Sequence, residues 1–133
     1  YRELLQPVHT RAVKWAHDHG IVAELHSCGD VMSLLPDIVS TGVDGLNPLE
    51  IKAGMDVRKV KREYGSRLTL RGGVNAVLWE QKEAIVSEIR DLIPVLKENG
   101  GYIFSSDHSI PNSVCLENFR EIVAEVKQVG AYR

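Results

Sequence analysis

The sequence has little cysteine, no surplus of basic residues and no long apolar run, and each shortage excludes a class of protein. Only two of the 133 residues are cysteines, too few for the disulfide framework of a small secreted protein. Acidic residues outnumber basic ones by 18 to 16, which argues against binding to nucleic acid or to an anionic membrane. No run approaches the roughly 18 apolar residues that cross a bilayer. A cytoplasmic protein fits these features best.

The remaining composition is that of an ordinary folded domain. Hydrophobic residues make up 44% of the chain and charged residues 26%, close to the averages for globular proteins and unlike disordered chains. A chain of 133 residues can bury a core of its own, so we interpret residues 1–133 as a single domain. The chain begins with Tyr1 rather than methionine, from which we expect that the natural start lies upstream.

Short apolar runs alternate with longer stretches of helical spacing. The runs have strand length at 21–25, 43–49, 68–74 and 102–105, and the helical stretches lie at 3–19, 31–40, 56–64, 79–99 and 116–129. Asp30 and Asp56 stand where helix caps are expected. Because a helix between two strands supplies the crossover that parallel strands require, the alternation predicts a parallel α/β sheet.

The length of the repeating unit indicates an architecture. From Ile21 to Arg133, four strand-then-helix units share 113 residues, which is about 28 per unit, whereas a complete (β/α)8 barrel of about 250 residues uses about 31 per unit. We therefore predict four consecutive βα units that form half of a TIM barrel. An open four-stranded sheet with helices on both faces is the alternative, because periodicity alone does not distinguish the two.

Polar residues at the carboxyl ends of the strands are the first candidates for a site, because these ends form the working rim of parallel α/β folds. His26 and Cys28 follow the first strand. Period-two alternation turns both side chains to one face, about 7 Å apart along the strand, and imidazole and thiolate are suitable ligands for one metal ion. The alternative is a buried cysteine beside a hydrogen-bonded histidine.

Two further strand ends carry candidate catalytic residues. Asp107 and His108 follow the fourth strand, where His108 would share the rim with His26 as a third ligand or a general acid–base. Glu50 follows the second strand and could complete the ligand set or orient one of its members. Each of these residues could instead be a solvated loop residue.

The third strand ends in Arg71, Gly72 and Gly73. Paired glycines allow a close approach of the backbone to a ligand, and Arg71 could pair with a carboxylate, so we take the three as candidate cofactor-binding residues. They fit neither G-x-G-x-x-G nor the phosphate-binding P-loop, so a nucleotide site lacks its fingerprint.

The sequence resembles the uroporphyrinogen decarboxylase (URO-D) superfamily in four runs, HSCGDVMSLLPDIVSTGVDGLNPLE, RGGVN, SSDHSIP and ENFREIVAEV. This superfamily contains the decarboxylase of haem and porphyrin biosynthesis, a lyase, and the zinc-dependent, corrinoid-linked methyltransferases. The resemblance covers essentially the whole chain. It implies the carboxyl-terminal half of a (β/α)8 barrel of about 250 residues or more, without the amino-terminal half.

The resemblance also implies roles for single residues. His26 and Cys28 match the H-x-C element that supplies two zinc ligands in the methyltransferase branch, whereas the decarboxylase lacks the cysteine. His108 matches the position of an active-site histidine in the decarboxylase and of the third zinc ligand, a cysteine, in the methyltransferases. A zinc ion held by His26, Cys28 and His108 would keep one position open for a thiolate that accepts a methyl group.

We therefore expect the parent enzyme to be a zinc-dependent methyltransferase that acts on a small molecule, with a corrinoid on a partner protein as the methyl carrier. A uroporphyrinogen decarboxylase with a tetrapyrrole substrate is the alternative. A third interpretation is a catalytically silent domain that self-associates, because four strands would leave two open edges and an apolar inner face. On that argument we expect a homo-oligomer.

Overall fold

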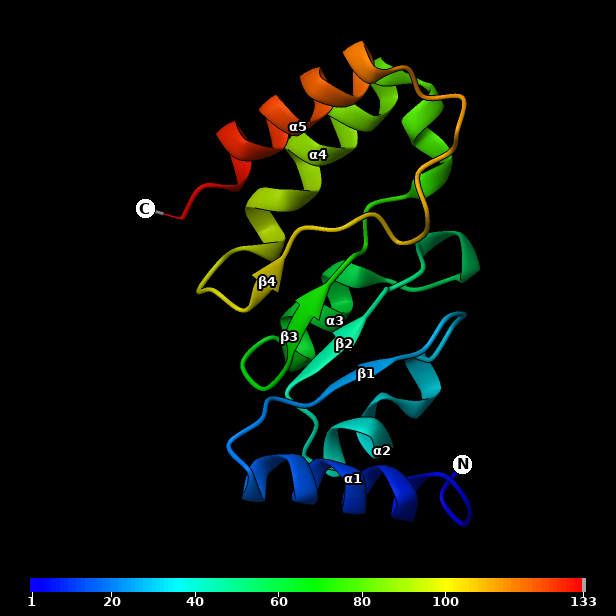
Figure 1. Cartoon of the computed structure of the whole chain (residues 1–133), viewed down its shortest axis with the longest axis vertical. Coiled ribbons are helices and arrows are strands. Elements are labelled where there is room, and N and C mark those ends of the chain that lie inside the picture. Colours follow the sequence, from blue (N-terminus) through cyan, green and yellow to red (C-terminus); the bar gives the residue numbers. More distant parts are fainter. Residues whose placement is uncertain (133) are drawn as a thin grey trace.

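The computed structural model describes residues 1–132 and confirms the predicted alternation of strands and helices (Figure 1). The helices are α1 (Gln6–Asp18), α2 (Leu35–Ser40), α3 (Val57–Tyr64), α4 (Lys82–Leu96) and α5 (Leu116–Gly130). The strands are β1 (Glu24–His26), β2 (Gly45–Asn47), β3 (Thr69–Arg71) and β4 (Tyr102–Ile103). Short 3-10 helices lie at Met32–Leu34, Ile51–Ala53 and Ala76–Glu80. Within the described residues, no helix is long and apolar enough to cross a membrane.

The four strands form one parallel sheet in the order β1-β2-β3-β4. Leu25, Leu46, Leu70 and Tyr102 stand opposite one another across the strands and join the hydrophobic core under the helices. In Figure 1, α2 and α3 lie behind the sheet, and no helix lies in front of it. The predicted βα units are thus confirmed as part of a TIM barrel, and the alternative of a sheet with helices on both faces is wrong.

Helix α4 lies within the stretch predicted to be helical and buries an apolar stripe. Its buried side chains are Ile85, Ile89, Leu92, Ile93 and Leu96. The helix is nevertheless shorter than the expected 79–99, because Asn75 Oδ1 accepts a hydrogen bond from Val77 N–H and begins a separate 3-10 turn before α4. The Asp56 cap of α3 is confirmed by its bond from Lys59 N–H at 2.9 Å.

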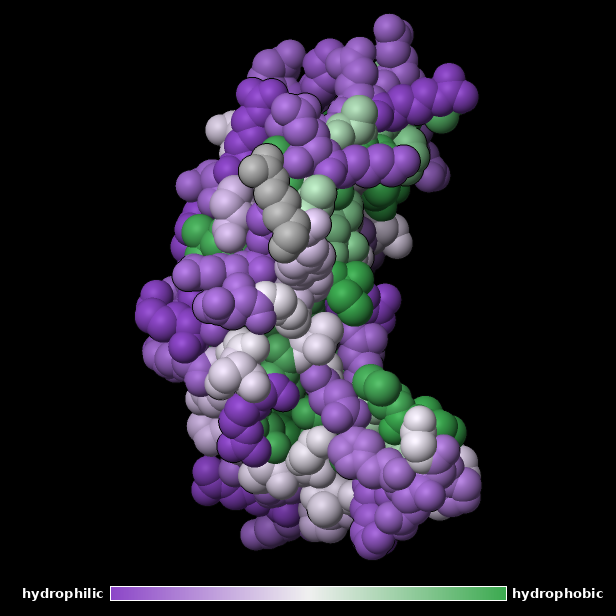
Figure 2. Space-filling view, turned by 90° about the vertical axis from the view of Figure 1, so that its left-hand side faces the viewer, coloured by the Kyte–Doolittle hydropathy of each residue, from purple (hydrophilic) through white to green (hydrophobic). Residues whose placement is uncertain are grey.

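The face of the sheet that no helix covers is polar. Arg71 on β3 donates from Nε and Nη2 to both carboxylate oxygens of Glu24 on β1, at 2.8 and 2.7 Å. The pair passes over β2 at Gly45, where a Cβ would lie only 3.2 Å from Glu24 Cγ. Figure 2 shows this face, at the right of the view, as a hollow between the two ends of the molecule, with hydrophobic residues at its upper and lower margins. The expected apolar inner face is therefore wrong, since Ile103 is its one large apolar side chain within the four strands.

The outer edge of β4 is covered by a side chain instead of a strand. The Tyr132 hydroxyl accepts a hydrogen bond from Tyr102 N–H at 3.3 Å and donates one to Tyr102 C=O at 2.7 Å. These backbone groups point away from β3, so the phenol occupies the place of a neighbouring strand. Self-association of the chain stays a prediction, which now rests on the edge of β1 and on exposed apolar residues rather than on the inner face.

Gly72 provides a test of how closely two segments of the sheet pack. Its φ is +108°, and a Cβ would lie 1.9 Å from the Pro48 carbonyl oxygen. We expect Gly72→Ala to lower the free energy of unfolding by about 2–5 kcal/mol, because left-handed strain adds to a backbone clash. Urea denaturation measures the loss. Gly20→Ala is the control, since Gly20 has φ +69° but no atom within 4 Å, and it should cost only about 1 kcal/mol; equal losses would contradict this explanation.

Candidate functional site

His26 and Cys28 meet at the carboxyl end of β1, as predicted. The Cys28 Sγ lies 3.4 Å from His26 Nε2, and His26 Nδ1 lies 2.6 Å from Asn47 Oδ1 on β2. Because an amide oxygen only accepts, Nδ1 carries the ring proton and Nε2 presents its lone pair to the thiol. Cys28 is exposed, so the alternative of a buried cysteine is wrong.

The pair has the spacing of two ligands on one zinc ion. A nitrogen at about 2.0 Å and a sulfur at about 2.3 Å from a tetrahedral zinc are roughly 3.5 Å apart, close to the observed 3.4 Å between His26 and Cys28. Within residues 1–132, however, no three His, Cys, Asp or Glu side chains are grouped closely enough to hold a metal. The structure therefore brings together two of the predicted ligands but does not bring His108 to them.

Glu50 ties the loop that contains Cys28 to the loop after β2. Its Oε2 accepts a hydrogen bond from Gly29 N–H at 2.8 Å, and Lys52 Nζ lies 3.4 Å from Oε1. The Gly29 N–H, followed by Lys52 and the nearby His108, holds the pKa of Glu50 below its ordinary 4.5, although burial acts in the opposite direction. Glu50 is therefore an ionised carboxylate that fixes the backbone next to Cys28.

Asp107 is fully buried and joins three strand ends. Its Oδ1 accepts from Ala76 N–H at 2.8 Å, its Oδ2 accepts from Ile51 N–H at 2.9 Å, and its own N–H donates to Val74 C=O at 2.8 Å. Both carboxylate oxygens are thus engaged by backbone amides, an arrangement that suits a positioning role. It places the next residue, His108, on the exposed rim.

The third predicted group, at the end of β3, is divided between an ion pair and close backbone packing. The Arg71 guanidinium holds the pKa of Glu24 below its ordinary 4.5, mainly through their hydrogen bonds. Gly73 N–H donates to Pro48 C=O at 2.9 Å, and Gly72 C=O accepts from the Tyr102 hydroxyl at 3.0 Å. The two glycines therefore let the segments after β2 and β3 approach each other.

The family of the chain follows from a comparison with known proteins. The family model described as uroporphyrinogen decarboxylase (URO-D) matches residues 1–129. The chain belongs to the URO-D family. This result confirms the resemblance at the level of the family, and it gives no support to the methyltransferase branch in particular.

Two curated relatives of this URO-D chain are named uroporphyrinogen decarboxylase. One, from Vesicomyosocius okutanii subsp. Calyptogena okutanii (strain HA), is 31% identical over 90 residues, which cover 67% of this chain and 25% of the relative. The other, from Pelodictyon phaeoclathratiforme (strain DSM 5477 / BU-1), is 27% identical over 106 residues, which cover 77% of this chain and 29% of the relative. The matched region thus spans less than a third of either relative's length.

The sequence analysis missed a buried carboxyl group beside the candidate site. Glu88 on α4 accepts a hydrogen bond at Oε1 from Asn75 N–H at 3.3 Å, next to the Ala76 amide that Asp107 binds. Its Oε2 is buried and has no hydrogen-bond partner. Burial raises the pKa of Glu88, and the neighbouring charges of Asp107 and Asp91 raise it further. One feature of the sequence could have predicted its burial: Glu88 lies next to the apolar residues that form the buried side of α4.

The raised pKa of Glu88 predicts a pH-dependent contribution to stability. Between pH 4.5 and its raised value, Glu88 binds more proton in the folded than in the unfolded chain, so the free energy of unfolding falls as pH rises through this window, by at most about 1.4 kcal/mol per pH unit. The pKa values of Glu24 and Glu50 are lowered, so their contributions vary mainly below pH 4.5.

We expect Glu88→Gln to flatten that slope, and urea denaturation between pH 4 and roughly pH 8 measures it. Glu63→Gln, at an exposed position on α3, should keep the wild-type slope. If both variants keep it, Glu88 is not the titrating group.

Proposed function

We propose that this URO-D chain supplies the carboxyl-terminal strands of a barrel that decarboxylates a porphyrinogen-type tetrapyrrole. The observation that carries the proposal is the polar, uncovered face of the sheet, whose rim presents the exposed imidazoles of His26 and His108. Membership of the family and the names of both relatives support the same substrate class. A substrate with several carboxylates is compatible with a polar face and not with an apolar one.

The chemistry needs a proton donor at the rim. When an acetate side chain of a pyrrole loses CO2, the electrons of the breaking C–C bond must enter the ring, so the ring has to accept a proton first. After CO2 leaves, the exocyclic carbon gains a proton and the ring carbon gives up the proton that it accepted. A methyl group thus replaces the acetate, with one proton consumed overall. In this proposal the exposed His108 at the rim donates the proton, and Asp107, held by two backbone amides, positions it.

Arg71 is the group proposed to bind a substrate carboxylate. Its guanidinium lies on the uncovered face and is partly exposed, and its fork of donors is occupied by Glu24 in the described structure. A substrate carboxylate would exchange with Glu24 for the same two donors. The ion pair thus keeps Arg71 extended along the face until a carboxylate competes for it.

The role of His108 predicts a large loss of turnover on substitution. With uroporphyrinogen as substrate and products separated by chromatography, His108→Asn should lower kcat by about 10²–10⁴-fold and change KM little, because a proton donor acts on the chemical step. His19→Asn is the matched control, since His19 is exposed at the end of α1 and hydrogen-bonds to Trp15 C=O. An unchanged kcat in His108→Asn would refute the assignment.

A second candidate function, zinc-dependent methyl transfer with a corrinoid protein as partner, is favoured by the 3.4 Å spacing of His26 and Cys28. Zinc bound there would supply Lewis acidity and stabilise a thiolate. The two side chains fit two of its ligand positions, and a third ligand, His108 or another group, would have to join them. Asn47 fixes the His26 ring so that Nε2 is free to bind.

Metal analysis separates the two candidates. Methyl transfer at this site predicts one zinc per chain in the purified protein, lost in Cys28→Ser because the thiolate is a required ligand. Cys115→Ser is the control, since Cys115 is also exposed and should leave the zinc content unchanged. Substoichiometric zinc in the wild-type chain, or equal loss in both variants, would contradict the second candidate and leave the decarboxylase proposal standing.

A further inference from the structure

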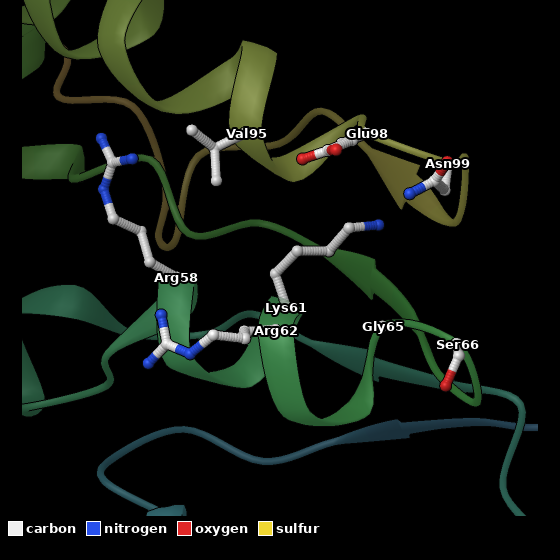
Figure 3. Close-up of a pocket in the computed structure, with 8 residues that line it drawn as sticks. All are labelled: Arg58, Lys61, Arg62, Gly65, Ser66, Val95, Glu98 and Asn99. Carbon is white, nitrogen blue, oxygen red and sulfur yellow. The ribbon is translucent and has the colours of Figure 1, made fainter.

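A basic groove lies between α3 and the carboxyl-terminal part of α4. Its volume is about 580 Å³, and we call it the α3–α4 groove, with Arg58, Lys61 and Arg62 on one wall and Val95 and Glu98 on the other (Figure 3). The loops that border it lead into β3 and β4. It therefore lies at the amino-terminal ends of the strands, opposite to the rim that presents His26 and His108.

One helix provides all three cations through its spacing. Positions 58, 61 and 62 stand three and four residues apart, so Arg58, Lys61 and Arg62 share one side of α3. Val57 and Val60 are buried in the core and fix the rotation of the helix. Lys59 and Glu63 belong to the same helix but do not line the groove. The positive charge at the groove therefore comes from one side of α3 only.

The positive charge of the groove is only partly neutralised. Among residues 1–132, no carboxylate forms an ion pair with Arg62 or Lys61, and Lys61 Nζ donates instead to Gly100 C=O at 2.6 Å. Arg58 pairs with Asp91, which leaves part of its guanidinium fork free. Burial lowers the pKa of Lys61, although the charge of Glu98 acts in the opposite direction.

The carboxyl end of a helix stabilises cations, but only with about half a unit of negative charge. That effect explains why Lys61 and Arg62 are tolerated in the last turn of α3. It does not balance Lys61 and Arg62, which have no ion-pair partner among the described residues. The local excess is notable in a chain whose formal net charge is −2, because a uniform attraction for anions is not expected of it.

The side chains divide the groove into two ends. In Figure 3 the guanidinium groups of Arg58 and Arg62 both lie on the side away from Glu98 and Asn99, that of Arg58 directed toward α4 and that of Arg62 toward the left of the view. The Lys61 amine points the other way, toward Glu98 and Asn99. The arginine end is the better anion site, because guanidinium groups bind phosphate oxygens through paired N–H donors and Glu98 competes at the lysine end.

We propose that the α3–α4 groove binds a small phosphate-bearing ligand, with Arg62 and the free part of Arg58 holding the phosphate and Lys61 adding long-range attraction. The site is independent of the chemistry proposed at the carboxyl ends of the strands. Asp91 acts as a competitor, since its carboxylate occupies Arg58 in the described structure.

Calorimetric titration with inorganic phosphate, at low ionic strength and against a chloride reference of equal ionic strength, tests the proposal. We expect saturable binding that weakens about tenfold or more in Arg62→Gln, because a charge-assisted hydrogen-bond pair is lost. Lys59→Gln removes the same charge from the same helix outside the groove and should change the affinity less than about twofold. Asp91→Asn should tighten binding, because it releases Arg58, whereas Glu63→Gln should not.

Each result bears directly on the site. Circular dichroism checks that the variants fold, which we expect because Arg62 is exposed. A tenfold loss in Arg62→Gln with Lys59→Gln unchanged, together with tighter binding in Asp91→Asn, supports a phosphate site. Equal losses in Arg62→Gln and Lys59→Gln would reveal general electrostatic attraction and overturn the proposal. Non-saturable binding, or no tightening in Asp91→Asn, would overturn it as well.

Discussion

The buried carboxylate of Asp107 is the contact on which the geometry of the rim depends. Three chain segments that are far apart in the sequence meet there, since Asp107 binds the amides of Ile51 and Ala76. Short strands of two or three residues have few ladder hydrogen bonds with which to fix their ends. A buried acceptor shared by two backbone donors makes up for that shortage, because leaving either donor without a partner would be costly.

The polar face of the sheet connects the fold to the proposed chemistry. Glu24 and Arg71 lie on the first and third strands, and Gly45 between them has no side chain to obstruct the pair. The same face leads to the rim, where Asn47 orients His26 and Glu50 anchors Gly29. The face therefore offers charged and hydrogen-bonding groups to a ligand, while the opposite face of each strand contributes to the core.

The helices and their alternation with strands could be predicted from sequence because they depend on local patterns. The apolar stripe of α4 and the Asp56 cap are properties of neighbouring residues. The polar inner face was missed because Glu24 and Arg71 are 47 residues apart, and no local sequence pattern predicts that they pair. Asn47 and Glu88 were missed for the same reason, since their importance comes from partners on other elements.

The candidate site was predicted in part. The rim followed from the rule that parallel strands end at one edge, and alternation correctly put His26 and Cys28 on one face. The distance from this pair to His108 depends on the paths of two loops, which no periodicity encodes. The resemblance to the family identified which residues match its site, but it did not predict the paths of these two loops.

The Tyr132 side chain determines how the edge of β4 could pair with another strand. Tyr132 already satisfies the amide and the carbonyl of Tyr102, so a strand arriving at this border would exchange one partner for another instead of meeting bare backbone. Such an exchange yields little energy on its own. Only a strand whose side chains also pack against this edge would displace the Tyr132 ring. The edge of β4 is therefore protected against non-specific strand pairing.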